Sequence, residues 1–404
     1  MKRSTGIKTT ILFLFFISIV SNSFAQEYSS TTFFPNISKT WTKIAPRPAL
    51  FMGRFLRPKC SGGPLCKGTP LSCSPGDTKF YFCVKGGTAN NLLIFFNGGG
   101  ACWDSMNCLY IPTYSKEINT TVEGLNQADG IFDMNHSANP FKDWSFVFIP
   151  YCTGDMHWGS NDKAYPDNLN LYGGEPFTIH HRGFDNFLVV LKWMTGNFKK
   201  PDNIFVTGSS AGSYGAILGF PYIQKVYPSS KVNMLGDAGS GVISEDFKTE
   251  SINNWGFQSN LPVWISGFDR PFSEYTIADM YKMMADYYSD SNLAQYTTAW
   301  DSVQTFFYNI MLNIDEPAKW FQLDSVECDW HHQMIDSFND AAEATNYRYY
   351  IGEGSDHTLL GSDKFYKEES AGVPFVEWVN SMIGNQDGIP RENAACPDCM
   401  NPCQ

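Results

Sequence analysis

The sequence predicts a doubly wound α/β fold, with a mostly parallel sheet and helices on both of its faces. Several short apolar runs are continuously hydrophobic rather than alternating, which is typical of strands covered on both faces. Segments with apolar residues at helical spacing lie between these runs, and this alternation of strands and helices is the pattern of a doubly wound sheet. With 43% hydrophobic and 17% charged residues, the 404-residue chain can form a large core, which excludes a disordered protein.

The predicted elements follow one another from residue 79 onward. The runs Lys79–Val84 and Asn91–Phe96 are expected to be strands that pair through a turn containing Gly86 and Gly87. Four more strands are expected at residues 144–150, 203–207, 232–235 and 347–351. Helices are expected at residues 184–194, 211–226 and 375–383.

The chain is expected to divide into four segments. Residues 1–25 have a basic start, an apolar run and a small-residue cleavage site at Ser23-Phe24-Ala25, which predicts a signal peptide and an exported protein, secreted or periplasmic. Residues 26–78 are expected to form an irregular, disulfide-tied lead-in, residues 79–385 the catalytic domain, and residues 386–404 a Cys-rich tail. Removal of the signal peptide changes the net charge from −12 to about −15, which makes nucleic acid a poor partner.

Eleven cysteines agree with an oxidising compartment, where thiols pair. Cys396 and Cys399 have the C-x-x-C spacing of some zinc and redox sites, but in an exported chain a disulfide is the better interpretation. Because eleven is odd, at least one thiol is expected to be free or to pair between chains.

The strongest motif is Gly208-Ser209-Ser210-Ala211-Gly212. Alone, G-x-S-x-G is a weak signal, and a Gly/Ser turn that caps a helix would also produce it. Here a predicted strand runs into the motif and a predicted helix follows it, which is the strand–turn–helix of a nucleophile elbow in an α/β-hydrolase-like fold. We therefore expect Ser210 to be a nucleophile, with the N–H groups of the following helix facing a developing oxyanion.

A second glycine run lies upstream, where Phe96 and Asn97 lead into Gly98, Gly99 and Gly100. An oxyanion hole needs an N–H donor from the loop after an early strand, and glycines let that backbone approach the substrate. An ordinary flexible turn is the alternative, but the position ahead of an elbow favours the oxyanion hole.

For the general base, the chain order Ser…Asp/Glu…His restricts the choice to His331, His332 and His357. His331 and His332 belong to a stretch that looks like the start of a helix, whereas His357 follows the last predicted strand, where a triad histidine belongs. The acid stays open between three residues at this point. Asp356 adjoins His357, Asp237 follows the strand after the elbow, and Asp301 lies between Ser210 and His357 in the sequence.

These motifs resemble the pectin acetylesterase/Notum family. The stretch Asn97–Cys102 is similar to the family's Glu-Gly-Gly-Gly-Trp-Cys, and Tyr151–Asp155 is similar to its Tyr-Cys-x-Gly segment. The other similar stretches are His181-Arg182-Gly183, the elbow at 208–212, Asp237-Ala238-Gly239, Tyr296–Gln304 and His357-Thr358. Asn97 replaces the family's acidic residue, Ala101 its Trp, and Ser213 a common third elbow glycine, so the shape of the acyl pocket is expected to differ.

The resemblance implies an α/β-hydrolase-like fold and a serine carboxylesterase with Ser210, His357 and Asp301 as its triad. The oxyanion hole would use the backbone N–H groups of Gly99, Gly100 and Ala211, and Asp237 would be structural. No metal or organic cofactor is implied. The first expected substrate is an acetyl ester of a polysaccharide such as pectin, although the acidic chain would oppose encounter with a polyanion unless the cleft is locally basic. The alternatives are a Notum-like deacylase for longer fatty acyl groups and, in another class, a non-catalytic secreted binding protein on the same fold.

Overall fold

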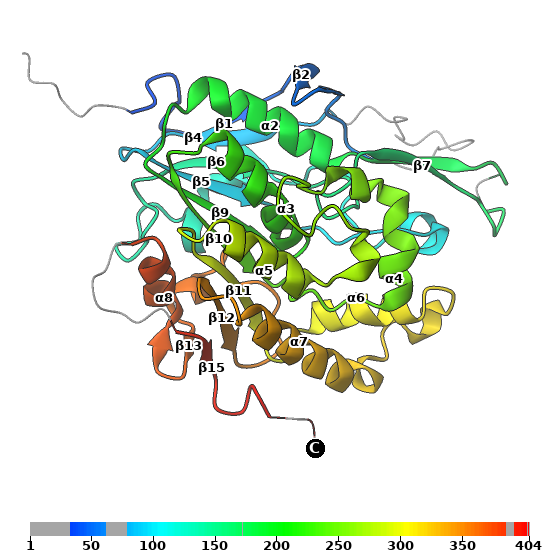
Figure 1. Cartoon of the computed structure of the whole chain (residues 1–404). Coiled ribbons are helices and arrows are strands. Elements are labelled where there is room, and N and C mark those ends of the chain that lie inside the picture. The colour runs from blue at the N-terminus through cyan, green and yellow to red at the C-terminus, as the bar shows by residue number, and fades with distance from the viewer. Residues whose placement is uncertain (1–32, 62–78, 172, 385–391, 402, 404) are drawn as a thin grey trace, which may run out of the picture. The chain divides into compact units, whose positions relative to one another are not determined.

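The computed structural model describes residues 33–61, 79–171, 173–384, 392–401 and 403 (Figure 1). The predicted signal peptide therefore lies outside the described residues. The centre of the described chain is a nine-stranded sheet in the order β1-β4-β6-β5-β9-β10-β11-β12-β15. Its strands are β1 (Thr42–Ile44), β4 (Phe82–Lys85), β6 (Ser145–Ile149), β5 (Asn91–Phe96), β9 (Asn203–Ser209), β10 (Lys231–Asp237), β11 (Leu293–Thr298), β12 (Tyr347–Gly352) and β15 (Ala394–Ala395).

All neighbouring strands from β6 to β15 are parallel, whereas β1 and β4 are antiparallel additions at one edge. The prediction of a mostly parallel sheet is confirmed. The order of the strands reverses at β5, because the next strand along the chain, β6, lies on one side of it and β9 on the other. In open α/β sheets the crevice at such a reversal is the usual place for a ligand.

The predicted pairing of the first two strands is wrong. β4 and β5 are separated in the sheet by β6, to which β4 is antiparallel and β5 parallel. The glycines between them serve another purpose. A Cβ on Gly87 would lie 2.3 Å from the backbone of Asp143 and Trp144, so this loop packs against the start of β6 instead of closing a hairpin. Close approach of two backbones and a tight turn favour glycine alike, so the sequence did not distinguish them.

Alternating residues of the sheet enter two separate hydrophobic cores. In β5, Leu92, Ile94 and Phe96 belong to the first core, and Leu93 and Phe95 to the second. The helices that contribute to the first core include α2 (Gly183–Asn197), α3 (Ala211–Val226), α5 (Ile277–Tyr287) and α7 (Glu327–Ala341). Those that contribute to the second are α1 (Val122–Asn126) and α8 (Phe375–Met382). Helices therefore cover both faces, as predicted, and the predicted helices correspond to α2, α3 and α8.

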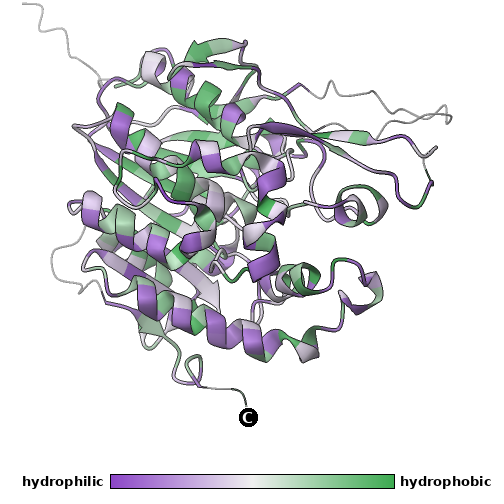
Figure 2. Cartoon of the chain, turned by 45° about the vertical axis from the view of Figure 1, so that its right-hand side comes forward, coloured by the Kyte–Doolittle hydropathy of each residue, from purple (hydrophilic) through white to green (hydrophobic). Residues whose placement is uncertain are grey.

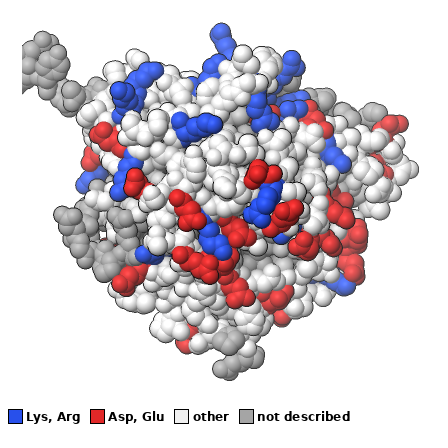
Figure 3. All heavy atoms as spheres, in the orientation of Figure 1, with Lys and Arg blue, Asp and Glu red and all other residues white. Residues whose placement is uncertain are grey.

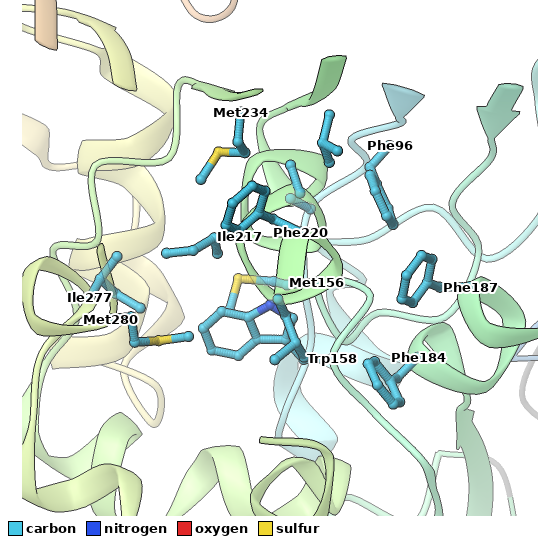
Figure 4. Packing of buried hydrophobic residues seen from close by; sticks show 14 of the residues in the cluster. Phe96, Met156, Trp158, Phe184, Phe187, Ile217, Phe220, Met234, Ile277 and Met280 are labelled. Carbon is cyan, nitrogen blue, oxygen red and sulfur yellow. The ribbon is translucent and has the colours of Figure 1, made fainter. Parts of the chain in front are cut away.

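Helix α3 lies at the centre of the first core. Figure 4 shows side chains of the sheet, of α2 and of α5 around it, among them Phe96, Phe187 and Met280. Figure 2 shows that hydrophobic residues are concentrated on the central strands, while the outer helices alternate between hydrophobic and hydrophilic residues. Burial of α3 on several sides fixes the helix rigidly, and its N-terminus carries Ser210.

The lead-in and the tail are more regular than expected. β1 belongs to the lead-in and pairs with β4, and the same segment forms a hairpin of β2 (Ala49–Phe51) and β3 (Arg54–Leu56). In the tail, β15 pairs with β12. The expectation of purely irregular ends was therefore wrong, because strands of two or three residues are too short to show a period in the sequence. A further hairpin, β7 (Asn161–Tyr165) and β8 (Phe177–His181), lies between β6 and α2 along the chain.

The described residues contain four disulfides, which are Cys60–Cys152, Cys102–Cys108, Cys328–Cys403 and Cys396–Cys399. The disulfide interpretation of the C-x-x-C motif is confirmed. Among the described cysteines Cys83 is free and lies buried in β4, where burial raises the pKa of its thiol to about 11. Cys66 and Cys73 lie outside the described residues. No helix in the described part of the chain is long and apolar enough to cross a bilayer.

Candidate active site

Ser210 occupies a sharp turn between β9 and α3. It has φ 58° and ψ −126°, a left-handed backbone conformation that is rare for a residue other than glycine. Its N–H donates to the backbone oxygen of Asp237 at 2.8 Å, which ties the turn to the end of β10. The flanking Gly208 and Gly212 are required by space, since a Cβ on either would lie within 2.3 Å of backbone atoms. The structure therefore contains the strand–turn–helix that the motif predicts.

The glycine loop after β5 lies directly against this turn, because Phe96 at the end of β5 is in register with Gly208 of β9. A Cβ on Gly98 would lie 2.8 Å from the Cβ of Ser210 and 2.6 Å from the oxygen of Ser209. Gly100 has φ 74°, and a Cβ there would lie 2.0 Å from the oxygen of Thr113. This loop can therefore approach the serine only without side chains.

A cavity opens in front of Ser210. Its lining consists of residues from seven parts of the chain, which are Gly100, Ala101, Trp103, Met156, Ser210, Ala211, Tyr214, Ala238, Val242, Ile243, Phe247, Val303, Gln304, Phe307, Met311, Trp330 and His357. The predicted residues Ser210, His357, Gly100 and Ala211 meet in this lining. Gly99 is not part of it, and a Cβ on this residue would lie 2.6 Å from the ring of Tyr151 and 2.9 Å from the hydroxyl of Ser115. Apart from the serine, the histidine and Gln304, the walls are mainly apolar and aromatic.

The imidazole of His357 contacts the carboxylate of Asp301. Nδ1 lies 2.9 Å from Oδ1 and 2.8 Å from Oδ2 of Asp301, and Asp301 has no solvent exposure. The Nδ1–H therefore donates to the carboxylate, which leaves Nε2 as the acceptor nitrogen. Nε2 is buried and has no hydrogen-bond partner among the described residues. An unpaired acceptor that belongs to a residue lining a cavity with a serine has the arrangement of a general base awaiting substrate.

Asp301 is held by the start of helix α6 (Ser302–Leu312), of which it is the N-cap. Its Oδ1 accepts the backbone N–H groups of Val303 at 3.0 Å and Gln304 at 2.9 Å. The Gln304 side chain donates to Oδ2 at 2.8 Å, and its own oxygen accepts from the N–H and hydroxyl of Ser240. Three donors thus hold the carboxylate in addition to the imidazole. Because the carboxylate is fixed, it also fixes the orientation of the histidine ring.

The two rival acids have other partners. Asp237 accepts hydrogen bonds from the Ser209 hydroxyl and from the N–H groups of Leu359 and Leu360, so it joins the elbow to the loop that carries His357. Burial raises the pKa of Asp237. The exposed carboxylate of Asp356 pairs with Lys364. Of the three acids considered, Asp301 alone has a hydrogen bond to His357 among those found in the described residues.

His331 and His332 both lie on α7. His331 is buried, stacks on Trp300 with ring centroids 4.0 Å apart, and contacts the backbone oxygens of Ala299 and Asn401. His332 is exposed. The choice of His357 over both residues agrees with these positions.

Several residues of the site were not found in the sequence. Gln304 had a usable signal, because Asp301-Ser302-Val303-Gln304 has the spacing of an N-cap followed by a polar N3 residue. His157 had none, since it lies in a loop after β6 with φ 61°. Burial lowers the pKa of His157 to about 4, so its ring is neutral. Its Nε2 donates to the backbone oxygen of Asn97 at 2.9 Å and so holds the start of the glycine loop. The aromatic walls, such as Phe247 and Phe307, come from elements too far apart in the sequence to be recognised.

Two groups of potential metal ligands exist in the described residues. One consists of Cys102, Cys108 and His181, and the other of Cys328, Cys403 and His332. In both groups the two sulfurs form a disulfide and offer no thiolate to an ion. These groups are therefore poor metal sites.

The sheet with its reversal at β5, the covering helices and the serine turn at the carboxyl end of β9 define an α/β-hydrolase-like protein. Within that class, the family model for pectinacetylesterase matches residues 69–311, and the chain belongs to this family.

Relatives of two kinds are similar to the chain. Pectin acetylesterase 7 of Arabidopsis thaliana is 24% identical over 232 residues, which are 52% of this chain and 56% of that protein. The palmitoleoyl-protein carboxylesterase NOTUM of Schmidtea mediterranea is 28% identical over 167 residues, which are 39% of this chain and 29% of that protein. The chain thus spans about half the length of the first relative and less than a third of the second. The solved structure of the Wnt deacylase Notum from Drosophila has the same fold, with a TM-score of 0.52 and 16% identity over 84% of this chain and 99% of that one.

Proposed function

We propose that the protein is a serine carboxylesterase with Ser210 as nucleophile, His357 as general base and Asp301 as the residue that orients the base. One observation carries the proposal. His357 donates from Nδ1 to the buried Asp301, while its Nε2 is unpaired and its ring lines one cavity with Ser210. This fixes the tautomer that accepts a proton from a hydroxyl. One relative is named an acetylesterase and the other a carboxylesterase, and both names support the same class of reaction.

In the proposed reaction, Ser210 Oγ attacks the ester carbonyl and gives its proton to Nε2 of His357. Asp301 stabilises the imidazolium without itself taking the proton. The oxyanion is held by the N–H groups of Gly100 and Ala211. Gly99 belongs to the same glycine loop but does not line the cavity. His357 then protonates the leaving alcohol. In the second step His357 takes a proton from water, which attacks the acyl-enzyme, and returns this proton to Ser210 Oγ as the acid is released. No step requires a metal or an organic cofactor.

The first proposed substrate is an O-acetyl ester of a polysaccharide. The family model and the Arabidopsis relative support this assignment. The predicted signal peptide would place the enzyme outside the cell, where such polymers occur.

A second candidate is an ester of a longer acyl group. The walls of the cavity favour it, because Trp103, Met156, Phe247, Phe307 and Met311 offer an apolar surface to an acyl chain. The planarian relative, named for a palmitoleoyl ester, supports the same alternative. The substrate classes differ in chain length, so one panel of esters separates them.

The test compares wild-type protein with Ser210→Ala on p-nitrophenyl esters from acetyl to palmitoyl. We expect the variant to lose at least about 1000-fold in kcat/KM while its thermal unfolding stays unchanged. A profile that falls steadily beyond acetyl would favour the polysaccharide substrate, and a maximum at longer chains would favour the second candidate. Substantial activity of the variant would contradict the assignment of Ser210 as nucleophile. A wild type that neither hydrolyses these esters nor reacts with a fluorophosphonate probe would favour the non-catalytic binding protein.

A further inference from the structure

The β2–β3 hairpin exposes an apolar face. Leu50 of β2 and Phe55 of β3 are directly opposite each other in the hairpin and are 66% and 62% exposed. Met52, in the turn between the strands, is 39% exposed. Cross-strand partners point to the same side of a hairpin, so the two large side chains form one surface next to the turn. Three large apolar side chains this close together form a patch rather than the scattered exposed residues of an ordinary surface.

The segment that carries this hairpin is basic. Residues 33–61 contain no Asp or Glu and six basic residues, which are Lys39, Lys43, Arg47, Arg54, Arg57 and Lys59. The whole chain, in contrast, has a net charge of −12. Figure 3 shows the same asymmetry, with Lys and Arg gathered over the part where β2 and α2 lie and Asp and Glu over the opposite half of the view. Arg47 and Arg57 are exposed, and the guanidinium of Arg57 lies 5.3 Å from the ring of Phe55.

The base of the hairpin is fixed to the body of the protein. Arg54 donates to the side chain of Asn260 at 2.6 Å, and Leu56 is buried. Lys59 exchanges two backbone hydrogen bonds with the side chain of Asn186 on α2, and the next residue forms the Cys60–Cys152 disulfide. The outward face is therefore presented by a rigid support, and binding would not need to order it first.

The combination of apolar and basic residues identifies the partner. A hydrated polyanion such as a polyuronate would account for the cations, but it offers nothing for Leu50, Met52 and Phe55 to enter. An anionic bilayer accounts for both, because large apolar side chains enter the headgroup and acyl boundary while basic residues are attracted to acidic headgroups. We propose that the β2–β3 hairpin is a docking surface for an anionic lipid membrane. Leu50, Met52 and Phe55 enter the interface, and Arg47 and Arg57 contact lipid phosphates.

The test is co-sedimentation of the exported form with vesicles of phosphatidylcholine, alone or with about one third phosphatidylglycerol. We expect binding to the anionic vesicles that weakens as salt is raised. The double variant Leu50→Ser/Phe55→Ser is expected to bind these vesicles at least about tenfold more weakly, because two large side chains no longer enter the interface. Arg47→Ala/Arg57→Ala is expected to bind anionic vesicles more weakly, and its remaining binding should depend less on salt.

A matched control removes equally exposed apolar side chains elsewhere. Val263 and Phe321 are 63% and 73% exposed and lie outside the hairpin, so Val263→Ser/Phe321→Ser should bind vesicles like the wild type. All variants should hydrolyse a soluble p-nitrophenyl ester at the wild-type rate, which separates this proposal from the proposed esterase function. The proposal is overturned if the wild type does not bind anionic vesicles or if the Leu50/Phe55 variant binds them equally well. It is also overturned if polygalacturonate, and not lipid, is bound in an arginine-dependent manner.

Discussion

At the scale of single residues, Asp301 both caps a helix and binds the imidazole of His357. Its Oδ1 caps α6 through two backbone N–H groups, and both of its oxygens contact His357. The sequence alone did not decide between Asp301, Asp237 and Asp356 as the acid, and the family resemblance favoured Asp301. Nothing in the local sequence states which carboxylate reaches an imidazole 56 positions away, because that depends on how β11 and β12 are placed in the sheet.

Replacement Asp301→Asn should lower kcat/KM by about 100- to 10,000-fold, since the amide can hold the histidine in the wrong tautomer and cannot stabilise the imidazolium. Asn is also a good N-cap, so we expect the unfolding temperature to change little. Steady-state kinetics and thermal unfolding check both parts. Asp356→Asn is the matched control, because Asp356 adjoins His357 but pairs with Lys364, and it should retain nearly full activity.

His181 makes the stability of the fold depend on pH. Its Nδ1–H donates to the oxygen of Thr153, its Nε2 accepts from the Tyr165 hydroxyl, and burial lowers its pKa to about 3. An unfolded histidine titrates near pH 6.5, so between these values the unfolded chain holds a proton that the folded chain does not. The folded state is therefore favoured at neutral pH, and its stability is lost as the pH falls.

We expect this residue to contribute a slope of about 1.4 kcal/mol per pH unit between about pH 6 and pH 4. His181→Gln should be less stable at neutral pH but should lose less stability on acidification, which urea unfolding at several pH values measures. Asp155, whose pKa is raised by burial to about 6, contributes with the opposite sign, so the comparison must be between the slopes of the two proteins. Identical slopes would contradict the assignment.

At the scale of elements, apolar runs located most of the sheet. The strands expected at 91–96, 144–150, 203–207, 232–235 and 347–351 correspond to β5, β6, β9, β10 and β12. β11 was missed because its sequence Leu-Ala-Gln-Tyr-Thr-Thr is half polar although every residue is buried. The side chain of Gln295 explains how this is tolerated, since it donates to the oxygen of Gly239 and accepts from the Tyr347 hydroxyl. A buried polar residue with partners in distant elements cannot be recognised from its own segment.

The contact between the glycine loop and the elbow predicts a sharp effect of one methyl group. Gly98→Ala would place a Cβ 2.6 Å from the Ser209 oxygen and 2.8 Å from the Ser210 Cβ, so one of the two loops must move. We expect kcat/KM to fall by about 100-fold or more, because displacement of the proposed nucleophile or oxyanion donors by about 1 Å has effects of this size. Gly196→Ala on α2 is the control, since its Cβ would meet no atom within 4 Å and should be neutral or stabilising. Equal activity of both variants would argue against a tight fit of the two loops.

At the scale of the whole molecule, disulfides join segments that are distant along the chain. Cys60 and Cys152 are 92 residues apart, and their bond ties the lead-in to the loop after β6. Cys102 and Cys108 are only 6 residues apart. Eleven cysteines and a predicted signal peptide predicted such bonds, but their connectivity depends on which segments the fold brings together and could not be read from the spacing.

Removal of the long-range bond should be the more costly change. For the double variant Cys60→Ser/Cys152→Ser we expect a loss of about 4 kcal/mol in the free energy of unfolding, against about 2 kcal/mol for Cys102→Ser/Cys108→Ser, because the longer closed loop restricts the unfolded chain more. Chemical denaturation of the two variants measures the difference. The opposite ranking would mean that local strain or residual structure outweighs loop entropy.

The position of Cys83 affects how the chain acquires these bonds. Thiol–disulfide exchange needs an accessible thiolate, and in the folded protein the thiol of Cys83 is buried and protonated because its pKa is about 11. Before β4 inserts between β1 and β6, the same sulfur is exposed to solvent and can attack any bridge that has formed. We therefore expect this thiol to take part in disulfide exchange only until the sheet is complete. Oxidative refolding of Cys83→Ala should consequently correct mispaired bridges more slowly, whereas the finished native protein should resist scrambling with or without this thiol.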